Sequence, residues 1–229
     1  MNGKIDYELL RDEIRGIRPA CRLIAVSKGQ PAAKIRDLYR RGQREFGENY
    51  VNELESKAAE LADLKDIRWV FIGALQSNKI QRVVRVASEI QTASSEKHLR
   101  YIDRIAGEAG KTPFPVFIEV NAAGESSKGG VLASEVAPLA ALAATMPGIS
   151  LQGIMVIPPV EIDDANYAGA GNAPPGMYRD LRQLADVTGM GKLSMGMSGD
   201  YKTALAAGSD CVRIGRSLFG ERTVTSKRE

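Results

Sequence analysis

The chain has 229 residues, of which 44% are hydrophobic and 26% are charged. This composition is ordinary for a soluble globular protein, and the length is sufficient for one large domain with a substantial core. The formal net charge of +3 comes from 31 basic and 28 acidic residues that are mixed along the chain. A surplus this small argues against nucleic acid or a membrane surface as a partner.

The sequence shows no targeting or membrane-spanning pattern. No apolar run approaches the roughly 18–20 residues that cross a bilayer. The opening stretch MNGKIDYELL carries acidic residues and lacks the apolar centre of a secretory signal. We therefore predict a cytoplasmic protein. We also expect a monomer with a single domain over residues 1–229.

Cysteine and histidine are too sparse to support several kinds of site. Cys21 and Cys211 each begin a predicted strand and have no CxxC or histidine neighbourhood, so we expect buried free thiols. The one histidine, His98, lies in the charged stretch SSEKHLR and is expected to be exposed. A Ser-His-Asp triad or a histidine-based metal site would need this residue, so neither is predicted.

The chain opens with a predicted amphipathic helix, followed by eight short apolar runs. The helix carries Ile5, Leu9, Leu10, Ile14 and Ile17 at helical spacing. The apolar runs cover residues 21–28, 44–49, 68–73, 89–93, 115–121, 151–157, 192–197 and 211–215. Most of the runs are almost continuously apolar, which is typical of parallel strands covered on both faces.

The segments between the runs have the 3.6-residue period of amphipathic helices. Near Leu139 and Leu142, Pro138 would have to fall in the first turn, so the sequence leaves the start of that helix undefined. Eight β–α alternations predict an α/β fold, a (β/α)8 TIM-type barrel with an extra N-terminal helix. The main alternative is an open doubly wound sheet, but no Gly-x-Gly-x-x-Gly motif opens the first helix.

One segment interrupts the alternation. The stretch PPVEIDDANYAGAGNAPPG, at 158–176, follows the sixth predicted strand and has the composition of a long loop. Two interpretations remain open for residues 159–176. They form either a tolerated surface insertion or a flap over a site, because the loop leaves the C-terminal end of its strand.

The predicted strand ends carry the residues best suited to chemistry, because functional groups of such barrels gather there. These ends are Lys28, Asn49, Gly73, Asn121, Ile157, MSGD at 197–200 and IGRS at 214–217. The last two are Gly/Ser turns that lead into possible helices, where backbone N–H groups can cradle a phosphate. A lysine beside a phosphate cradle suggests a Schiff base with a phosphorylated aldehyde.

Short motifs are distributed over nearly the whole chain: AVSKGQP at 25–31, FGENYVNE at 46–53, FIGALQSNK at 71–79, EVN at 119–121, ESSKGGV at 125–131, GIMVIP at 153–158, LSMGMSGD at 193–200 and VRIGRSLFGER at 212–222. Together they resemble the motifs of the pyridoxal phosphate homeostasis proteins, the single-domain relatives of the alanine racemase barrel. They recur in family order. The resemblance implies a protein that binds pyridoxal 5′-phosphate (PLP) and maintains its intracellular supply.

The resemblance also implies roles for individual residues. Lys28 matches the lysine that forms the Schiff base with PLP, and Arg213 matches the arginine that faces the pyridine nitrogen. A guanidinium does not give up its proton, so the ring nitrogen would stay unprotonated and the cofactor would be a weaker electron sink. Asn49 lies where the family places a polar side chain beside the ring.

The phosphate cradle implied by the resemblance consists of Ser198 and the backbone amides of Gly199, Gly215 and Arg216. Asp200 is interpreted as a helix cap or first-turn acid, because Ser and Asp are normal capping residues. Two positions depart from the family pattern: Val70 replaces the usual histidine, and Lys202 replaces a residue that is commonly acidic or an amide. Lys202 is expected to alter the charge near the phosphate.

Three functions from different classes remain, and we favour the first. It is a PLP carrier without enzymatic activity, with PLP-dependent apoenzymes as recipients. A PLP-dependent racemase would need a second base, which the racemase family supplies as a tyrosine from a separate β-domain that we do not expect here. Tyr50 and Tyr201 are candidates only by their proximity to strand ends. An aldolase-type barrel would use Lys28 with Glu48 or Glu119 as the acid/base group.

Overall fold

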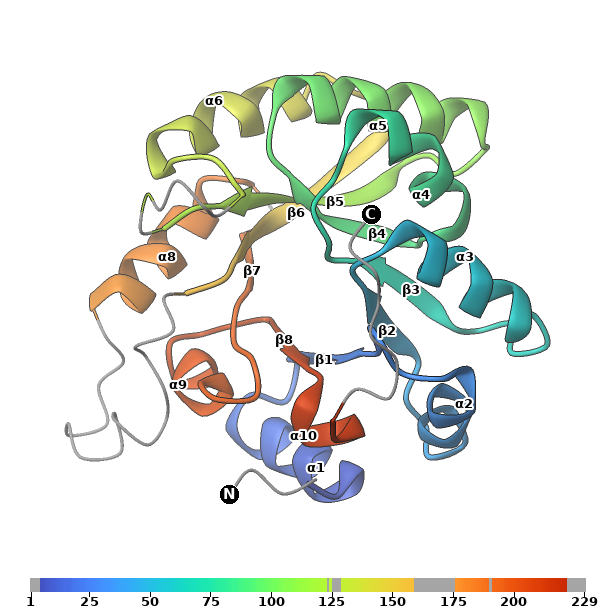
Figure 1. The fold of residues 1–229 in the computed structure, drawn as a ribbon. Helices are drawn as coiled ribbons and strands as arrows, with labels where there is room; N and C mark the ends of the chain where they lie inside the picture. The colour runs from blue at the N-terminus through green and yellow to red at the C-terminus, as the bar shows by residue number, and fades with distance from the viewer. Residues whose placement is uncertain (1–4, 123, 125–128, 159–175, 190, 222–229) are drawn as a thin grey trace.

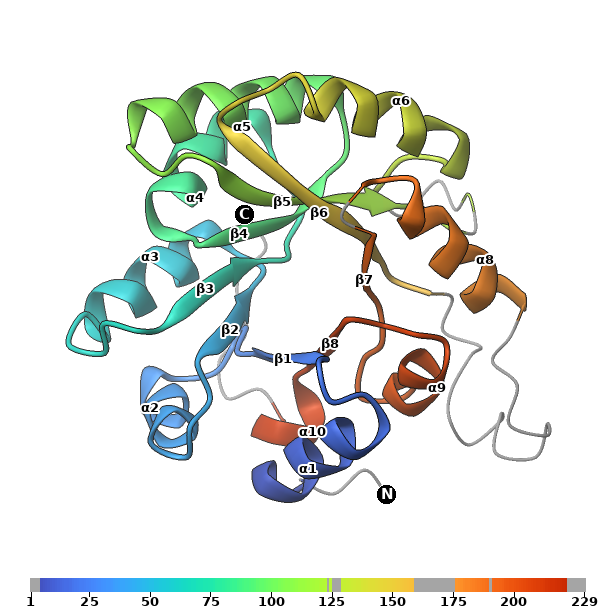
Figure 2. The same ribbon diagram turned by 180° about the vertical axis from the view of Figure 1, so that it is seen from behind.

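In a computed structural model, the chain forms a closed barrel of parallel strands surrounded by helices (Figures 1 and 2). The structure describes residues 5–122, 124, 129–158, 176–189 and 191–221. The strands pair in chain order from β1 to β8, and β8 pairs with β1 to close the barrel. The predicted (β/α)8 barrel with an N-terminal helix is therefore confirmed.

The strands are β1 (Arg22–Val26), β2 (Glu45–Glu48), β3 (Arg68–Phe71), β4 (Glu89–Ala93), β5 (Phe114–Val120), β6 (Ile149–Val156), β7 (Lys192–Ser194) and β8 (Cys211–Ile214). The helices are α1 (Tyr7–Ile17), α2 (Ala32–Arg40), α3 (Val51–Glu60), α4 (Ile80–Val86), α5 (Glu96–Glu108), α6 (Ala133–Ala143), α8 (Gly176–Asp186), α9 (Tyr201–Ala206) and α10 (Arg216–Phe219), with a 3₁₀ turn η1 (Ser77–Lys79). Most predicted runs extend too far at their C-terminal ends, where the chain has already turned into a loop.

Helix α1 covers the seam where β8 meets β1, beside the short helices α9 and α10 (Figure 1). The Ile5 amide donates to the Ser217 carbonyl at 2.7 Å, and Tyr201 Oη donates to Glu13 Oε2 at 2.7 Å. Leu10 is buried, as predicted. Leu9 and Ile17 of the predicted apolar stripe instead face solvent, because the buried face runs through Tyr7, Leu10 and Ile14.

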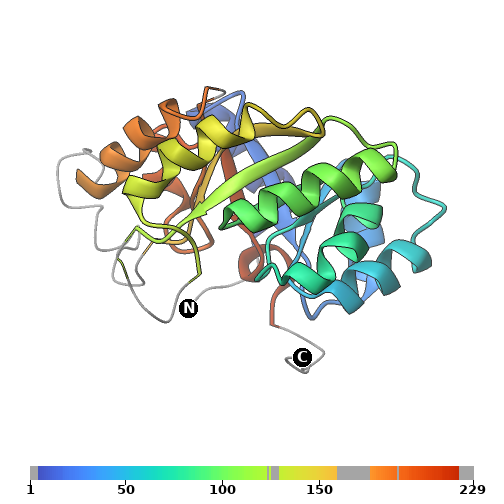
Figure 3. The same cartoon turned by 90° about the horizontal axis from the view of Figure 1, so that it is seen from above.

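The core has two layers, one inside the barrel and one between the barrel and its helices. Figure 3 shows helices on the outside of the strands. Along β1, Leu23 and Ala25 pack in the outer layer, whereas Ile24 and Val26 face the barrel interior. The interior apolar cluster joins Ile24 and Val26 to Val70, Ile72 and Cys211. Alternate residues of each strand therefore identify which side chains can reach a site inside the barrel.

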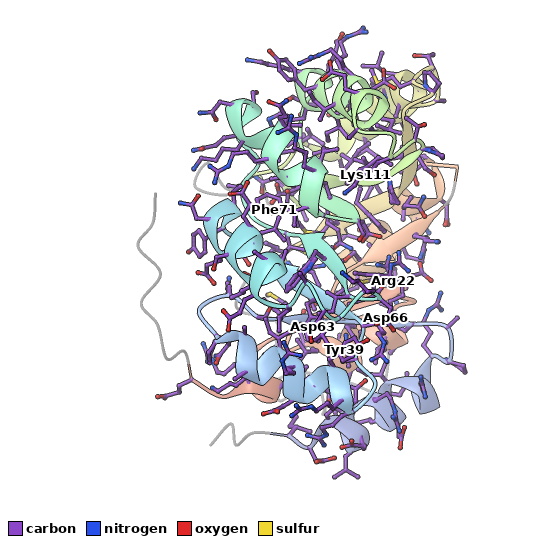
Figure 4. The ribbon with its side chains drawn as sticks, turned by 90° about the vertical axis from the view of Figure 1, so that its right-hand side faces the viewer. Arg22, Tyr39, Asp63, Asp66, Phe71 and Lys111 are labelled. Carbon is purple, nitrogen blue, oxygen red and sulfur yellow. The ribbon has the colours of Figure 1, made fainter. Side chains whose placement is uncertain are left out.

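Polar side chains connect the outer helices to neighbouring loops (Figure 4). Lys111, just before β5, donates through Nζ to carbonyl groups at the C-terminal end of α4. The acceptors are the carbonyls of Val84, Arg85 and Ala87, at 2.9, 2.8 and 3.1 Å. These contacts satisfy carbonyls that a helix end leaves without intrahelical partners. At a separate place on the barrel, Tyr39 of α2 donates to Asp66 in the loop before β3 (Figure 4).

Two expectations about helices are corrected by the structure. Pro138 lies in the interior of α6 and not in its first turn. It faces solvent, so water can reach the carbonyl that the missing proline N–H leaves unbonded. Residues 159–175 of the predicted loop lie outside the described residues, and Gly176 already belongs to α8.

His98 and the cysteines differ in part from their predicted environments. His98 is half-buried rather than exposed, because its ring packs back on Ser94 at the start of α5, and burial lowers its pKa. Cys211 is buried as predicted, whereas Cys21 is only partly buried and precedes β1 by one residue. Both are free thiols. Burial raises their pKa to about 12 for Cys21 and about 11 for Cys211, which leaves little reactive thiolate.

Over the described ranges, no helix is long and apolar enough to cross a bilayer.

Helix α1 should contribute strongly to stability. We expect Leu10→Ala to lower the free energy of unfolding by about 2–5 kcal/mol, because it removes a fully buried side chain and leaves a cavity. The matched control is Leu9→Ala on the same helix, where the side chain is 70% exposed and the change should stay within about 0.5 kcal/mol. Urea unfolding followed by circular dichroism measures both. Equal effects would contradict the assigned face.

Candidate functional site

Lys28 and Asn49 lie at the same level of the barrel, at the C-terminal ends of β1 and β2. Val26 is paired with Gly47, and the Ser27 amide donates to the Gly47 carbonyl at 3.0 Å, so the two strands stay side by side as far as their ends. Val26 and Gly47 face the barrel interior, and Lys28 and Asn49 follow them by two residues. Lys28 is half-buried and lies in a turn two residues beyond the end of β1. The predicted strand over 21–28 was thus too long, but the predicted place of Lys28 at the barrel mouth is correct.

The turn that carries Lys28 is held by a buried ammonium group on α3. Lys57 Nζ donates to the Ser27 carbonyl at 2.8 Å, and to Glu48 Oε1 and Glu53 Oε2 at 2.7 Å each. The Gly29 amide in turn donates to Glu53 Oε2 at 2.8 Å. The residues on both sides of Lys28 are therefore anchored, and the three protons of the Lys57 ammonium are all used.

Glu48 belongs to this anchor and not to the barrel interior. It is fully buried, and its Oε1 accepts a hydrogen bond from Ser27 Oγ at 2.6 Å as well as from Lys57. Burial raises the pKa of Glu48, and the Lys57 ammonium opposes this effect. The side chain lies on the outer face of β2 with Phe46, so it is directed away from the inward-facing side of Lys28. The aldolase interpretation therefore loses Glu48 as its acid/base group.

Arg213 is buried inside the barrel, two inward-facing positions deeper than Lys28. It pairs with Ile24 in the β1–β8 ladder, and only 4% of the residue is exposed. Its Nη1 donates to Ser194 Oγ and its Nη2 to the Val156 carbonyl, both at 2.7 Å. Burial lowers the pKa of Arg213, although an arginine remains protonated in proteins. The guanidinium is therefore a fixed cation inside the barrel.

The turns after β7 and β8 are in contact with each other. Ser198 Oγ lies 3.5 Å from the Ser217 amide nitrogen, which joins the MSGD turn to the start of α10. A Cβ atom at Gly215 would lie 3.2 Å from the Val26 carbonyl oxygen, so glycine allows this turn to pack closely on β1. Gly199 is exposed in the turn that precedes α9, and Arg216 is the exposed first residue of α10. Backbone N–H groups at such turns suit an anionic group.

Asp200 holds the first of these turns. Its Oδ1 accepts a hydrogen bond from the Met197 amide at 2.7 Å, and its Oδ2 accepts one from Tyr178 Oη at 2.7 Å. The residue occupies the N-cap position of α9, as predicted, but its side chain makes no capping bond to that helix. Asp200 is therefore a support for the turn that contains Ser198.

Asn49 offers a buried acceptor to the site. Its Oδ1 is buried and has no hydrogen-bond partner among the described residues. A Cβ atom at Gly73 would lie 1.8 Å from the Asn49 carbonyl oxygen. Only glycine therefore allows these two segments of the backbone to lie so close together. An orphaned buried oxygen is costly unless a ligand or water supplies a donor. The residues present thus fit a ligand with an aldehyde for Lys28, a polar ring and a phosphate.

Comparisons with known proteins find relatives over nearly the whole chain. The family model "Alanine racemase, N-terminal domain" matches residues 5–223. Relatives named "Pyridoxal phosphate homeostasis protein" come from Schizosaccharomyces pombe (39% identity, 87% of this chain and 84% of the relative), Pseudomonas aeruginosa (40%, 87% and 84%) and Escherichia coli K12 (34%, 95% and 96%). The chain belongs to the pyridoxal phosphate homeostasis protein family.

Solved structures of this family share the barrel. The structure of PipY from Synechococcus elongatus without PLP has a TM-score of 0.79 and 36% identity, and covers 93% of this chain and 99% of PipY. The structure of PipY with PLP bound has a TM-score of 0.78 at 33% identity, with the same coverage. Alanine racemase from Corynebacterium glutamicum (TM-score 0.61, 18% identity, 98% and 64% coverage) shares the fold alone.

Two departures from the family pattern have clear surroundings. Val70 is packed in the interior apolar cluster, where it contributes no titratable group. Lys202 Nζ lies 2.6 Å from Glu13 Oε1 of α1, and this ion pair accounts for its charge. Tyr201 also donates to Glu13, so its hydroxyl is turned toward α1 and away from the barrel mouth. Tyr50 precedes α3 at its N-cap position, and the candidate site does not depend on it.

Sequence reasoning missed Lys57, Ser194 and Gln91. Gln91 and Ser194 are fully buried on inward-facing positions of β4 and β7, and Ser194 Oγ donates to Gln91 Oε1 at 2.8 Å. The sequence does contain a signal for Gln91, because Glu89 and Gln91 are polar residues at alternate positions of a correctly predicted strand and therefore share one face of it. Lys57 could not be found this way, since its helix pattern is that of any partly exposed lysine.

Glu119, on the inward-facing side of β5, should make stability depend on pH. Burial raises its pKa from 4.5 to about 7, and the Arg213 charge partly opposes this. Between these two values the folded protein holds a proton that the unfolded chain releases, so stability falls as pH rises through this window. In Glu119→Gln the fall should be smaller, which thermal unfolding between pH 4.5 and 7 measures. The control is Glu60→Gln at an exposed position of α3; parallel curves for wild type and Glu119→Gln would contradict the assignment.

Proposed function

We propose that this protein binds PLP through a Schiff base on Lys28 and acts as a carrier that buffers the intracellular supply of PLP. The observation that carries the proposal is the arrangement at the barrel mouth. A half-buried lysine stands level with an unpartnered amide oxygen, above a fixed guanidinium and beside two joined Gly/Ser turns. The names of the relatives and the PLP bound to PipY support the same ligand.

Each predicted residue then has a stated part in holding PLP. The Lys28 amine condenses with the aldehyde, forming a C=N bond and releasing one water molecule, and hydrolysis reverses the step. Arg213 faces the pyridine nitrogen, and Asn49 lies beside the ring. Ser198 and the amides of Gly199, Gly215 and Arg216 form the phosphate cradle, in which hydrogen bonds to a charged group are stronger than neutral ones.

The carrier interpretation is favoured over a racemase by the site itself. A guanidinium keeps its proton, so the ring nitrogen facing Arg213 receives none and PLP is a weaker electron sink. The hydroxyl of Tyr201, one candidate second base, is bonded to Glu13 outside the barrel mouth. Release of PLP needs only reversal of the Schiff base. We propose PLP-dependent apoenzymes as the recipients of the PLP. We further propose that the protein is a cytoplasmic monomer with a single PLP-binding domain over residues 1–229.

Lys28→Ala should abolish covalent attachment and leave the fold intact, because a lysine in a turn adds little to the core. Wild-type protein incubated with PLP and reduced with borohydride should gain the mass of the reduced adduct on Lys28, as located by peptide mass spectrometry. Lys97→Ala, at an exposed position of α5, is the matched control and should behave as wild type. A stoichiometric adduct in Lys28→Ala would identify another lysine as the anchor.

PLP should bind far more tightly than unphosphorylated pyridoxal. Each hydrogen bond to the charged phosphate contributes about 1.5–3 kcal/mol, so the loss of several should weaken binding by orders of magnitude. Equilibrium titration by absorbance measures both ligands. Similar dissociation constants would show that the turns after β7 and β8 do not form a phosphate cradle.

A paired assay tests the carrier function directly. The PLP-loaded protein should activate a PLP-dependent apoenzyme when the two proteins are mixed in one compartment, without a dialysis membrane between them. The same protein should show negligible racemisation of alanine. Loss of a positioned acid/base group costs about 10²–10⁴-fold in rate. Racemase turnover of about 1–10³ s⁻¹, together with no activation of the apoenzyme, would replace the carrier by an enzyme.

A further inference from the structure

A continuous chain of hydrogen bonds runs through the barrel interior from Arg213 to the opposite mouth. Arg213 donates to Ser194 Oγ at 2.7 Å, Ser194 donates to Gln91 Oε1 at 2.8 Å, and Gln91 Nε2 donates to Glu89 Oε1 at 2.7 Å. Glu89 Oε2 accepts from Arg22 Nη1 at 2.9 Å. Ser194 and Gln91 are fully buried, and Glu89 and Arg213 nearly so.

The chain has a single direction. A serine hydroxyl has one proton, and Ser194 gives it to Gln91, so toward Arg213 it can only accept. The Gln91 amide is fixed in the same sense, because its NH₂ group faces the Glu89 carboxylate and its oxygen faces Ser194. Every donor between Arg213 and Glu89 therefore points toward the carboxylate, and such aligned bonds polarise and strengthen one another.

This chain of hydrogen bonds explains how the buried Arg213 guanidinium is held without a salt bridge. Among the described residues, no carboxylate forms a salt bridge with Arg213, whose side chain donates to a hydroxyl and to a carbonyl. The nearest carboxylate on its hydrogen-bond chain is Glu89, reached through Ser194 and Gln91. Glu89 in turn is paired with Arg22, which also binds Glu45 at 2.9 Å.

We propose that Gln91 is a positioning residue which, through Ser194, fixes the plane and direction of the Arg213 guanidinium toward the ring of the bound cofactor. The Val156 carbonyl holds one nitrogen of the guanidinium from β6, and the hydroxyl that Gln91 orients holds the other from β7. Two points of attachment on different strands define the plane of a rigid planar group. The proposal rests on the proposed function for the identity of the ligand, but not for the state of Arg213 itself.

The test compares Gln91→Met with Ser194→Ala and with the double variant. Methionine keeps the approximate volume and removes both hydrogen bonds, and Ser194→Ala leaves the bond between Gln91 and Glu89 in place. The matched control is Thr92→Val on the same strand, because Thr92 Oγ1 is buried and has no hydrogen-bond partner among the described residues. Circular dichroism and thermal unfolding verify the fold of every variant.

The first readout is made on the protein without PLP. In ¹⁵N-arginine-labelled protein, the Arg213 side-chain N–H groups should exchange with solvent at least about tenfold faster in Gln91→Met and in Ser194→Ala. The Thr92→Val protein should show the wild-type rate. Unchanged exchange in a folded Gln91→Met protein overturns the proposal, whatever the protein binds.

The second readout is the dissociation constant for PLP. It should rise about tenfold in each single variant, and about tenfold rather than a hundredfold in the double variant, because both changes interrupt one chain. Unchanged affinity in Gln91→Met, or additive effects in the double variant, overturns the proposal while the proposed function stands. If wild-type protein does not bind PLP, the proposed function fails, and the exchange experiment still decides whether Gln91 positions Arg213.

Discussion

Closure of the barrel by the β1–β8 pairing is the constraint on which the candidate site depends. The register places Ala25 beside Ile214, so the turn after β8 lies against the strand that carries Lys28. In an open sheet, Lys28 and the Gly/Ser turns would belong to opposite edges. Closure also removes two edge strands with unpaired backbone groups, and α1 covers the seam.

The barrel interior is divided into an apolar side and a polar side. Beneath Lys28 and Asn49, the interior is filled by Ile24, Val70 and Ile72. Around Arg213 it is filled by the hydrogen-bonded groups of β4 and β7. Buried polar networks rarely stabilise a protein more than well-packed apolar side chains would. The polar side is therefore better explained by the proposed PLP site than by stability alone.

The fold and most of the candidate site could be predicted from the sequence, because they depend on local patterns. Apolar runs alternating with helical periods predict the strands, and the last residues of the first two predicted runs are Lys28 and Asn49. The predictions that were wrong concern residues whose environment depends on packing between elements. The ring of His98 is shielded by the turn before its own helix, Leu9 faces solvent because neighbouring helices decide which face of α1 is covered, and Glu48 turns outward to meet Lys57 of α3. No local pattern contains these contacts.

The seam between the first and last strands also determines when the site can exist during folding. The hydrogen bond between Tyr201 and Glu13 joins residues that are 188 positions apart, and β1 likewise pairs with the last strand, β8. Such long-range contacts form late, after the entropy of closing a long loop has been overcome. A partly synthesised chain therefore has Lys28 but no complete pocket. A ligand that needs both ends of the chain binds only the closed barrel, and by mass action it draws nearly folded molecules toward completion.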